Sequence, residues 1–122
     1  MDHQSQNVLI VDDNELLLFA LQHYLEKDFH HVAAVTTGVK ALTEIGRQFY
    51  GRVVLDVNLP DINGLDLMAL IKQQSPDSSV FIMTSNDYDE VRDHAFQRGA
   101  SGFFGKPFDI EKLKGVLTAP LV

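Results

Sequence analysis

The sequence predicts a doubly wound α/β fold, in which a parallel sheet is covered by helices on both faces. Three short runs, residues 8–11, 53–55 and 80–83, are continuously apolar and rich in β-branched residues, as strands buried on both faces are. Two weaker strand candidates, residues 31–35 and 101–104, alternate with segments of helical length and period. This regular alternation predicts five parallel strands joined by right-handed crossovers and five helices.

The first helix is expected from about residue 14 to residue 27. Its apolar period places Leu17, Ala20, Leu21 and Tyr24 on the stripe that faces the core. Phe19 falls on the opposite, polar side of this helix. An aromatic side chain in that position is compatible with a docking contact.

The remaining helices are expected over residues 38–48, 65–74, 88–98 and after Pro107. Gly99 suits the position that follows the fourth helix, and Asp109 suits the N-cap of the fifth. The side chains predicted to face the core are Ala41, Leu42 and Ile45 in the second helix, Leu67, Leu70 and Ile71 in the third, Val91, Ala95 and Phe96 in the fourth, and Ile110, Leu113 and Leu117 in the fifth.

Length and composition favour one domain over residues 1–122, with no second domain. The chain has 122 residues, a formal charge of −7 and no cysteine, which excludes thiol nucleophiles and Cys-based metal sites. The excess negative charge argues against nucleic-acid contacts by this domain. No apolar run approaches the length of a membrane span, and the polar N-terminus does not resemble a signal peptide. We therefore expect a cytoplasmic protein without membrane contact.

Polar residues follow four of the predicted strands. Ligands of parallel α/β sheets bind outside the carboxyl ends of the strands, which all meet at one edge. The residues at these strand ends are Asp12 and Asp13 after the first strand, Asp56 and Asn58 after the third, Thr84 and Ser85 after the fourth, and Lys106 after the fifth. The sequence therefore predicts three carboxylates, a hydroxyl and an ammonium group at one edge.

Three carboxylates at one edge need a compensating charge. Two carboxylates 4 Å apart repel each other by about 4 kcal/mol at an effective dielectric constant near 20. A divalent cation offsets this repulsion, and a site with few, all-oxygen protein ligands suits Mg²⁺. A carboxylate nucleophile, a metal ion, the cation of Lys106 and a hydroxyl donor together form the set that phosphoryl transfer needs.

The motifs that carry these residues resemble the receiver domain of response regulators in two-component signal transduction, and in particular the chemotaxis response regulator. The resemblance extends from about Val8 to Leu117 and rests on residues 11–13, 55–64, 83–85 and 99–108. It implies a flavodoxin-like, three-layer fold with strand order 2-1-3-4-5. It also implies a role in a phosphorelay.

The resemblance assigns Asp56 as the phospho-acceptor. The phosphoryl group would come from a phosphohistidine of a histidine kinase or a histidine phosphotransfer protein. Asp13 and Asp56 would bind Mg²⁺ directly, Asn58 through its backbone carbonyl, and Asp12 through a water molecule. The same family assignment makes the chain a phospho-acceptor switch and not an enzyme that turns over an external substrate.

The resemblance also assigns the residues that respond to phosphorylation. Thr84 would bond a phosphoryl oxygen, Lys106 would pair with the same group, and the Lys106–Pro107 peptide bond would be cis. Phe103 occupies the place of the aromatic switch, where the chemotaxis pattern has tyrosine, so a contact through a hydroxyl is lost. The output surface would comprise the fourth helix, fifth strand and fifth helix, and a homodimer could form on phosphorylation.

Other interpretations of these residues remain open at this point. Asp12 and Asp13 are also suited to an acidic cap of the first helix, and Thr84 to a helix-cap hydroxyl. A phosphatase of the haloacid dehalogenase type also uses an aspartate after a strand, but it would require a second aspartate at position 58, where this chain has Asn58. A flavodoxin-like FMN carrier would require a phosphate-binding loop where Asp12 and Asp13 stand.

Overall fold

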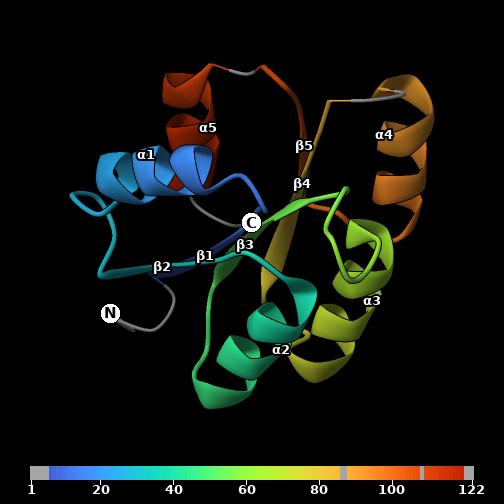
Figure 1. Cartoon of the computed structure of the whole chain (residues 1–122), viewed down its shortest axis with the longest axis horizontal. Helices are drawn as coiled ribbons and strands as arrows, with labels where there is room; N and C mark the ends of the chain where they lie inside the picture. Colours follow the sequence, from blue (N-terminus) through green and yellow to red (C-terminus); the bar gives the residue numbers. More distant parts are fainter. Residues whose placement is uncertain (1–5, 86–87, 108, 120–122) are drawn as a thin grey trace.

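The computed structural model describes residues 6–85, 88–107 and 109–119, and it has the predicted alternation of strands and helices. One five-stranded parallel sheet has the order β2-β1-β3-β4-β5, which confirms the expected order (Figure 1). The elements are β1 (Asn7–Val11), α1 (Glu15–Leu25), β2 (His31–Val35), α2 (Gly38–Arg47), β3 (Arg52–Asp56), α3 (Gly64–Gln74), β4 (Ser79–Thr84), α4 (Tyr88–Gln97), β5 (Gly102–Gly105) and α5 (Ile110–Thr118).

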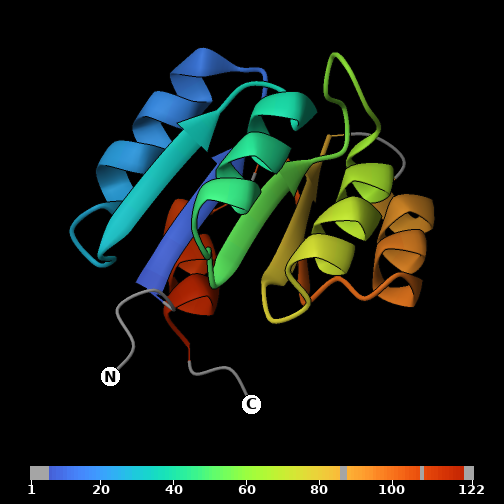
Figure 2. The same ribbon diagram turned by 90° about the horizontal axis from the view of Figure 1, so that it is seen from below.

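The sheet is the middle layer of three. Helices α1 and α5 lie on one face, and α2, α3 and α4 lie on the other (Figure 2). Alternate residues of β1 supply the two cores, since Leu9 packs with the side of α2 and α3 and Ile10 packs with the side of α1 and α5. All five residues of β1 and all five of β3 are buried, as strands covered on both faces must be.

Helix α1 is rotated relative to the sequence prediction. Leu18, Leu21 and Leu25 are its buried residues, whereas Ala20, which was predicted to face the core, is exposed. Residues 16–21 of this helix are all apolar, so the period alone does not fix which side is buried. Phe19 is 72% exposed, which confirms its predicted place on the outer side.

Two predictions for other helices also need correction. Leu70 in α3 is 40% exposed and Phe96 in α4 is 49% exposed, so neither belongs to the core. The adjacent residues Ile71 in α3 and Ala95 in α4 are fully buried, so the side of each helix that faces the core does not include Leu70 or Phe96. The remaining predicted core positions of these helices are buried or half-buried.

The predicted helix ends are confirmed. Gly99 follows α4 with φ of 99°, a left-handed conformation that glycine adopts without strain. The Asp109 side chain accepts hydrogen bonds from the backbone N–H groups of Glu111 and Lys112 and so caps α5.

Within the described residues, no helix is both long and apolar enough to span a membrane.

Candidate functional site

The register of the sheet brings the ends of the central strands together. Val11 pairs with Leu55, Asp56 with Met83, and Thr84 with Gly105. The residues that follow β1 and the last residues of β3 and β4 therefore lie at one edge, as the sequence predicts.

Three aspartates form a cluster at this edge. Asp12, Asp13 and Asp56 each have a carboxylate oxygen within 4.8 Å of an oxygen of the other two. Asp12 is fully buried and Asp56 is 4% exposed, whereas Asp13 is exposed. Two charged groups of the cluster are thus largely shielded from water, while the third borders solvent.

Lys106 joins the two buried carboxylates. Its ammonium donates a hydrogen bond of 2.6 Å to Asp12 Oδ2 and one of 3.2 Å to Asp56 Oδ2. The peptide bond between Lys106 and Pro107 is cis, the isomer that the resemblance implies. The backbone N–H of Lys106 donates to the Thr84 carbonyl at 2.7 Å, which fixes the start of the loop after β5.

Backbone amides occupy the other oxygens of the buried carboxylates. The N–H of Asn14 donates to Asp12 Oδ1 at 2.9 Å, and the N–H of Asn58 donates to Asp56 Oδ1 at 3.2 Å. Each carboxylate is therefore held from two sides, by the chain that follows it and by Lys106. Such fixed partners orient the carboxylates before any ligand binds.

Burial and charge shift the pKa values at this site. Burial raises the pKa of Asp56, and the negative charge of Asp12 acts in the same direction, against the hydrogen bond from Asn58 and the charge of Lys106. Burial alone would lower the pKa of Lys106, but its hydrogen bonds to Asp12 and Asp56 and their charges outweigh burial and raise it. Lys106 is therefore a stable cation, whereas an additional positive charge would favour the ionised form of Asp56.

The donor set fits a hard divalent cation. The cluster offers carboxylate oxygens only, at separations that one ion could bridge, and one of its members is accessible to solvent. Magnesium ions prefer such sites, because they keep several water ligands and need few protein carboxylates. Asn58 is exposed, and its backbone N–H donates to Asp56, so the residue lies next to the cluster.

The two predicted switch residues lie on β4 and β5. Thr84 is the last residue of β4 and is 1% exposed. Phe103 pairs with Ile82 of the neighbouring strand, is half-buried and packs against the core on the side of α2, α3 and α4. The structure thus places Thr84 at the acidic edge, whereas Phe103 lies level with Ile82, two residues before Thr84. Phe108, the last residue of the fourth motif, lies outside the described residues.

The segment from the end of β3 to the first residue of α3 contains two residues whose roles the sequence analysis did not identify. The N–H of Gly64 donates to the Val57 carbonyl at 2.8 Å, and a Cβ at this position would meet the backbone of Asp56 and Val57. Asp61 accepts hydrogen bonds from the N–H groups of Gly38 and Val39, at 2.9 and 3.0 Å, and so caps the start of α2. Gly64 is the last residue of the motif 55–64, but only contacts in three dimensions show what Gly64 and Asp61 do.

Comparisons with known proteins agree with this geometry. Residues 8–118 match the family model described as the response regulator receiver domain. The chain is 32% identical over 112 residues to the probable transcriptional regulatory protein TcrX of Mycobacterium tuberculosis, covering 92% of this chain and 48% of that protein. It thus spans about half the length of this relative.

Solved structures show the same similarity. The beryllofluoride-activated NtrC4 receiver domain dimer matches with a TM-score of 0.86 and 33% identity, over 92% of this chain and 93% of that one. A response regulator from Burkholderia pseudomallei, with a phosphorylated aspartic acid and a calcium ion, matches with a TM-score of 0.84 and 26% identity, over 92% and 66%. The sheet order, the acidic edge with its lysine and these matches agree, and the chain belongs to the receiver domain family of two-component response regulators.

Proposed function

We propose that this chain is a phospho-acceptor switch and that Asp56 receives the phosphoryl group. The observation that carries the proposal is the environment of Asp56, a buried carboxylate at the end of β3 that lies 3.2 Å from the Lys106 ammonium and beside two further aspartates. A carboxylate that is held in place by neighbouring donors is oriented to act as a nucleophile. The phosphorylated aspartic acid of the Burkholderia pseudomallei relative supports the same chemistry.

The donor would be a phosphohistidine of a histidine kinase or a histidine phosphotransfer protein. An oxygen of Asp56 attacks the phosphorus atom while the bond from phosphorus to the imidazole nitrogen breaks, and the imidazole leaves with the electron pair of that bond. The phosphoryl group thus moves from nitrogen to oxygen without any oxidant or external base. The chain would promote only its own phosphorylation and dephosphorylation.

Asp12, Asp13, Asp56 and the backbone carbonyl of Asn58 would hold Mg²⁺ at this site. The ion would neutralise charge that develops on the phosphoryl oxygens. Asp12 and Asp56 are positioned for this role by Lys106 and by the backbone amides that follow them. Asp13 completes the set from the solvent side.

The phosphoryl group would change the balance of conformations. It adds about −1.5 to −2 charges next to Lys106 and the buried hydroxyl of Thr84, which would donate hydrogen bonds to its oxygens. Movement of Thr84 at the end of β4 would leave room for Phe103 on the paired strand β5. The surface of α4, β5 and α5 would carry this change to a partner, which includes a second copy of the chain, in keeping with the NtrC4 dimer.

Helix α1 would face the phosphodonor. Its outer side exposes Leu16 at 84% and Phe19 at 72%, and the Phe19 ring stacks on His23 with centroids 6.3 Å apart. Replacing Phe19 with serine should slow transfer from a protein donor while phosphorylation by acetyl phosphate continues. An unchanged rate with the protein donor would remove Phe19 from the docking surface.

Intact-mass spectrometry tests the proposed function. Wild-type protein incubated with Mg²⁺ and acetyl phosphate should gain one phosphoryl group, and chelation of the metal should abolish the gain. Asp56→Asn should gain nothing, whereas Asp66→Asn, a change at an exposed aspartate of α3, should behave as wild type. A folded wild type that gains no phosphoryl group, or an Asp56→Asn variant that does, would refute the proposal.

A further inference from the structure

The chain between β3 and α3 forms a loop whose two ends are held together. The N–H of Gly64, the first residue of α3, donates to the Val57 carbonyl at 2.8 Å, and Asn58 forms an antiparallel bridge with Asn63. The N–H of Asn58 also donates to Asp56 Oδ1 at 3.2 Å. The base of this loop is therefore fixed beside the phospho-acceptor.

The middle of the loop is held by the first turn of α2. The two carboxylate oxygens of Asp61 accept hydrogen bonds from the N–H of Gly38 at 2.9 Å and from that of Val39 at 3.0 Å. These N–H groups have no partner within the helix, because they belong to its first turn. A Cβ at Gly38 would meet Ile62 as well as Asp61, so the loop approaches the helix closely. One carboxylate thus joins the loop to the start of α2.

The contact between Asp61 and α2 is charge-assisted. The hydrogen bond from Gly38, followed by the one from Val39, lowers the pKa of the Asp61 carboxyl below its ordinary value. The positive end of the helix dipole favours a negative charge at the same place. Asp61 is therefore ionised at neutral pH, and its two hydrogen bonds are stronger than bonds between neutral groups.

We propose that Asp61 is a positioning residue for this loop and that, by holding the loop on α2, it sets the affinity of the site for Mg²⁺. The inference rests on the proposed function, in which the backbone carbonyl of Asn58 helps to hold the ion. Asp61 would act through the loop and not as a ligand of the ion. A loop that is held in one conformation beforehand loses less conformational entropy when the ion binds. Without the bonds to α2, the loop would gain freedom and the ion would bind more weakly.

Isothermal titration calorimetry with magnesium chloride tests this inference without any phosphorylation step. Asp61→Asn keeps the shape of the side chain but replaces one acceptor oxygen by an NH₂ group, which cannot accept a bond from α2. We expect the dissociation constant for Mg²⁺ to rise about tenfold. The rate of labelling by acetyl phosphate should match that of wild type at saturating Mg²⁺, because Asp61 does not touch the reacting atoms.

A second variant breaks the same contact without changing the net charge. Val39→Pro removes the N–H that donates to Asp61 Oδ2, and proline is tolerated in the first turn of a helix. Gly38, which precedes it, has no Cβ to clash with the proline ring. Relative to Val39→Ala, which keeps the N–H, Val39→Pro should raise the dissociation constant about threefold. It should add little to the effect of Asp61→Asn in the double variant, because both changes remove one contact.

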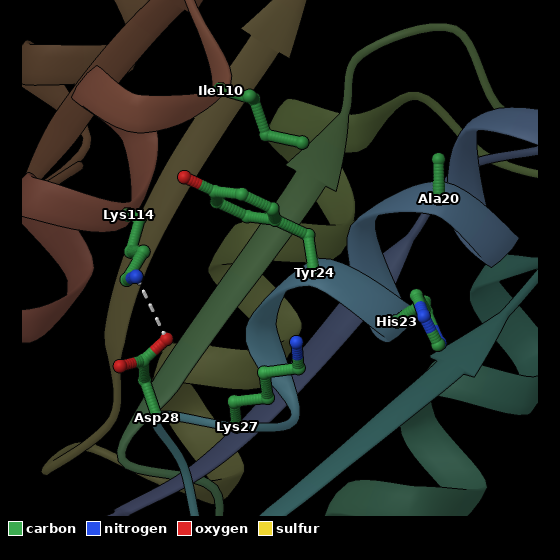
Figure 3. A pocket seen from close by; sticks show the side chains of 7 residues that line it. All are labelled: Ala20, His23, Tyr24, Lys27, Asp28, Ile110 and Lys114. Atoms are coloured by element: carbon green, nitrogen blue, oxygen red, sulfur yellow. Dashed lines mark ion pairs between the residues drawn. The ribbon is translucent and has the colours of Figure 1, made fainter.

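Asp28→Asn is the matched control. The Asp28 carboxylate also joins two segments of the chain, since it pairs with the Lys114 ammonium of α5 at 3.0 Å on the face covered by α1 and α5 (Figure 3). The variant loses the same charge and the same kind of group, but it should bind Mg²⁺ as wild type does. Wild-type affinity in Asp61→Asn, or an equal loss in Asp28→Asn, would overturn the inference. Equal affinities in Val39→Pro and Val39→Ala would also overturn it.

Calorimetry separates failure of this inference from failure of the proposed function. If acetyl phosphate labels Asp56 in wild type but folded Asp61→Asn binds Mg²⁺ with wild-type affinity, only the inference fails. If wild type binds Mg²⁺ but is not labelled, the proposed function fails, and the comparison of affinities still tests Asp61. Absence of Mg²⁺ binding by wild type would contradict both. Circular dichroism of each variant measures whether it is folded.

Discussion

Asp56 carries a charge at a position where only 4% of the residue reaches solvent. Because burial raises the pKa of Asp56 in the folded protein, ionisation of this group costs stability at neutral pH. Asp56→Asn should raise the melting temperature of the metal-free protein by roughly 2–6 °C at pH 7. Thermal unfolding followed by circular dichroism in a chelator measures the difference.

The sign of this effect fixes its pH dependence. Below the ordinary aspartate value of 3.8 the carboxyl is protonated in both the folded and the unfolded state, so wild type and Asp56→Asn should differ little. The advantage of the variant should grow as the pH rises through the raised pKa of Asp56. An advantage that is largest in acid would contradict the assignment of burial as the cause.

Lys106 has the opposite effect, since it stabilises two buried carboxylates at once. Lys106→Met keeps most of the aliphatic chain but leaves Asp12 and Asp56 without their shared cation. We expect a loss of about 2–4 kcal/mol in the free energy of unfolding at pH 7, measured by urea denaturation. Lys112→Met, at an exposed position of α5, should change it little, and equal losses in the two variants would contradict the role of the ion pair.

At the scale of elements, the approach of α3 to the end of β3 depends on Gly64. A Cβ at this position would meet the Asp56 carbonyl, and would lie 2.7 Å from the Val57 Cα. Gly64→Ala should therefore cost about 1–3 kcal/mol of stability and slow phosphorylation of Asp56, because backbone atoms must shift to admit the methyl group. Urea denaturation and intact mass measure the two effects.

Gly115 in α5 provides the control. Nothing lies within 4 Å of a Cβ built on it, so Gly115→Ala should stabilise α5 by about 0.5–1 kcal/mol. Loss of stability in Gly115→Ala, or none in Gly64→Ala, would contradict the steric explanation. The comparison separates the general effect of glycine replacement from the close contact at the site.

The sequence predicted most elements because local signals and tertiary packing agree in them. The strands β1, β3 and β4 are buried on both faces, and their apolar runs reveal them directly. The rotation of α1 could not be predicted, because residues 16–21 are apolar all round the helix and contacts with the sheet decide which side is buried. The outward positions of Leu70 and Phe96 likewise depend on how much surface neighbouring elements cover.

The strand order predicts which residues of the candidate site lie together, and tertiary contacts determine how the neighbouring loops are held. Strand order places Asp12, Asp56 and Lys106 at one edge, and this order follows from the alternation of strands and helices together with the resemblance. The capping of α2 by Asp61 joins segments 23 residues apart in the sequence and has no local signal. Spacing within the chain therefore indicates which residues meet, but not which neighbouring loops hold them in place.

At the scale of the whole molecule, part of the net charge of −7 is concentrated at one edge of the sheet. A ligand that binds only the folded state stabilises it according to its concentration and affinity. Millimolar Mg²⁺ should therefore raise the melting temperature, and Asp13→Asn should reduce the increase. Asp66→Asn removes the same charge outside the cluster and should keep the wild-type increase. Equal increases in Asp13→Asn and Asp66→Asn would contradict a site at Asp13.

The measurement that tests the central claim most directly is chemical trapping of the acyl phosphate. Borohydride reduces an aspartyl phosphate to homoserine, and tandem mass spectrometry of the peptides then identifies its position. After incubation with Mg²⁺ and acetyl phosphate, we predict homoserine at position 56 and aspartate retained at positions 12 and 13. Homoserine at position 12 or 13, or aspartate retained at all three positions, would contradict the assignment of Asp56 as the phospho-acceptor.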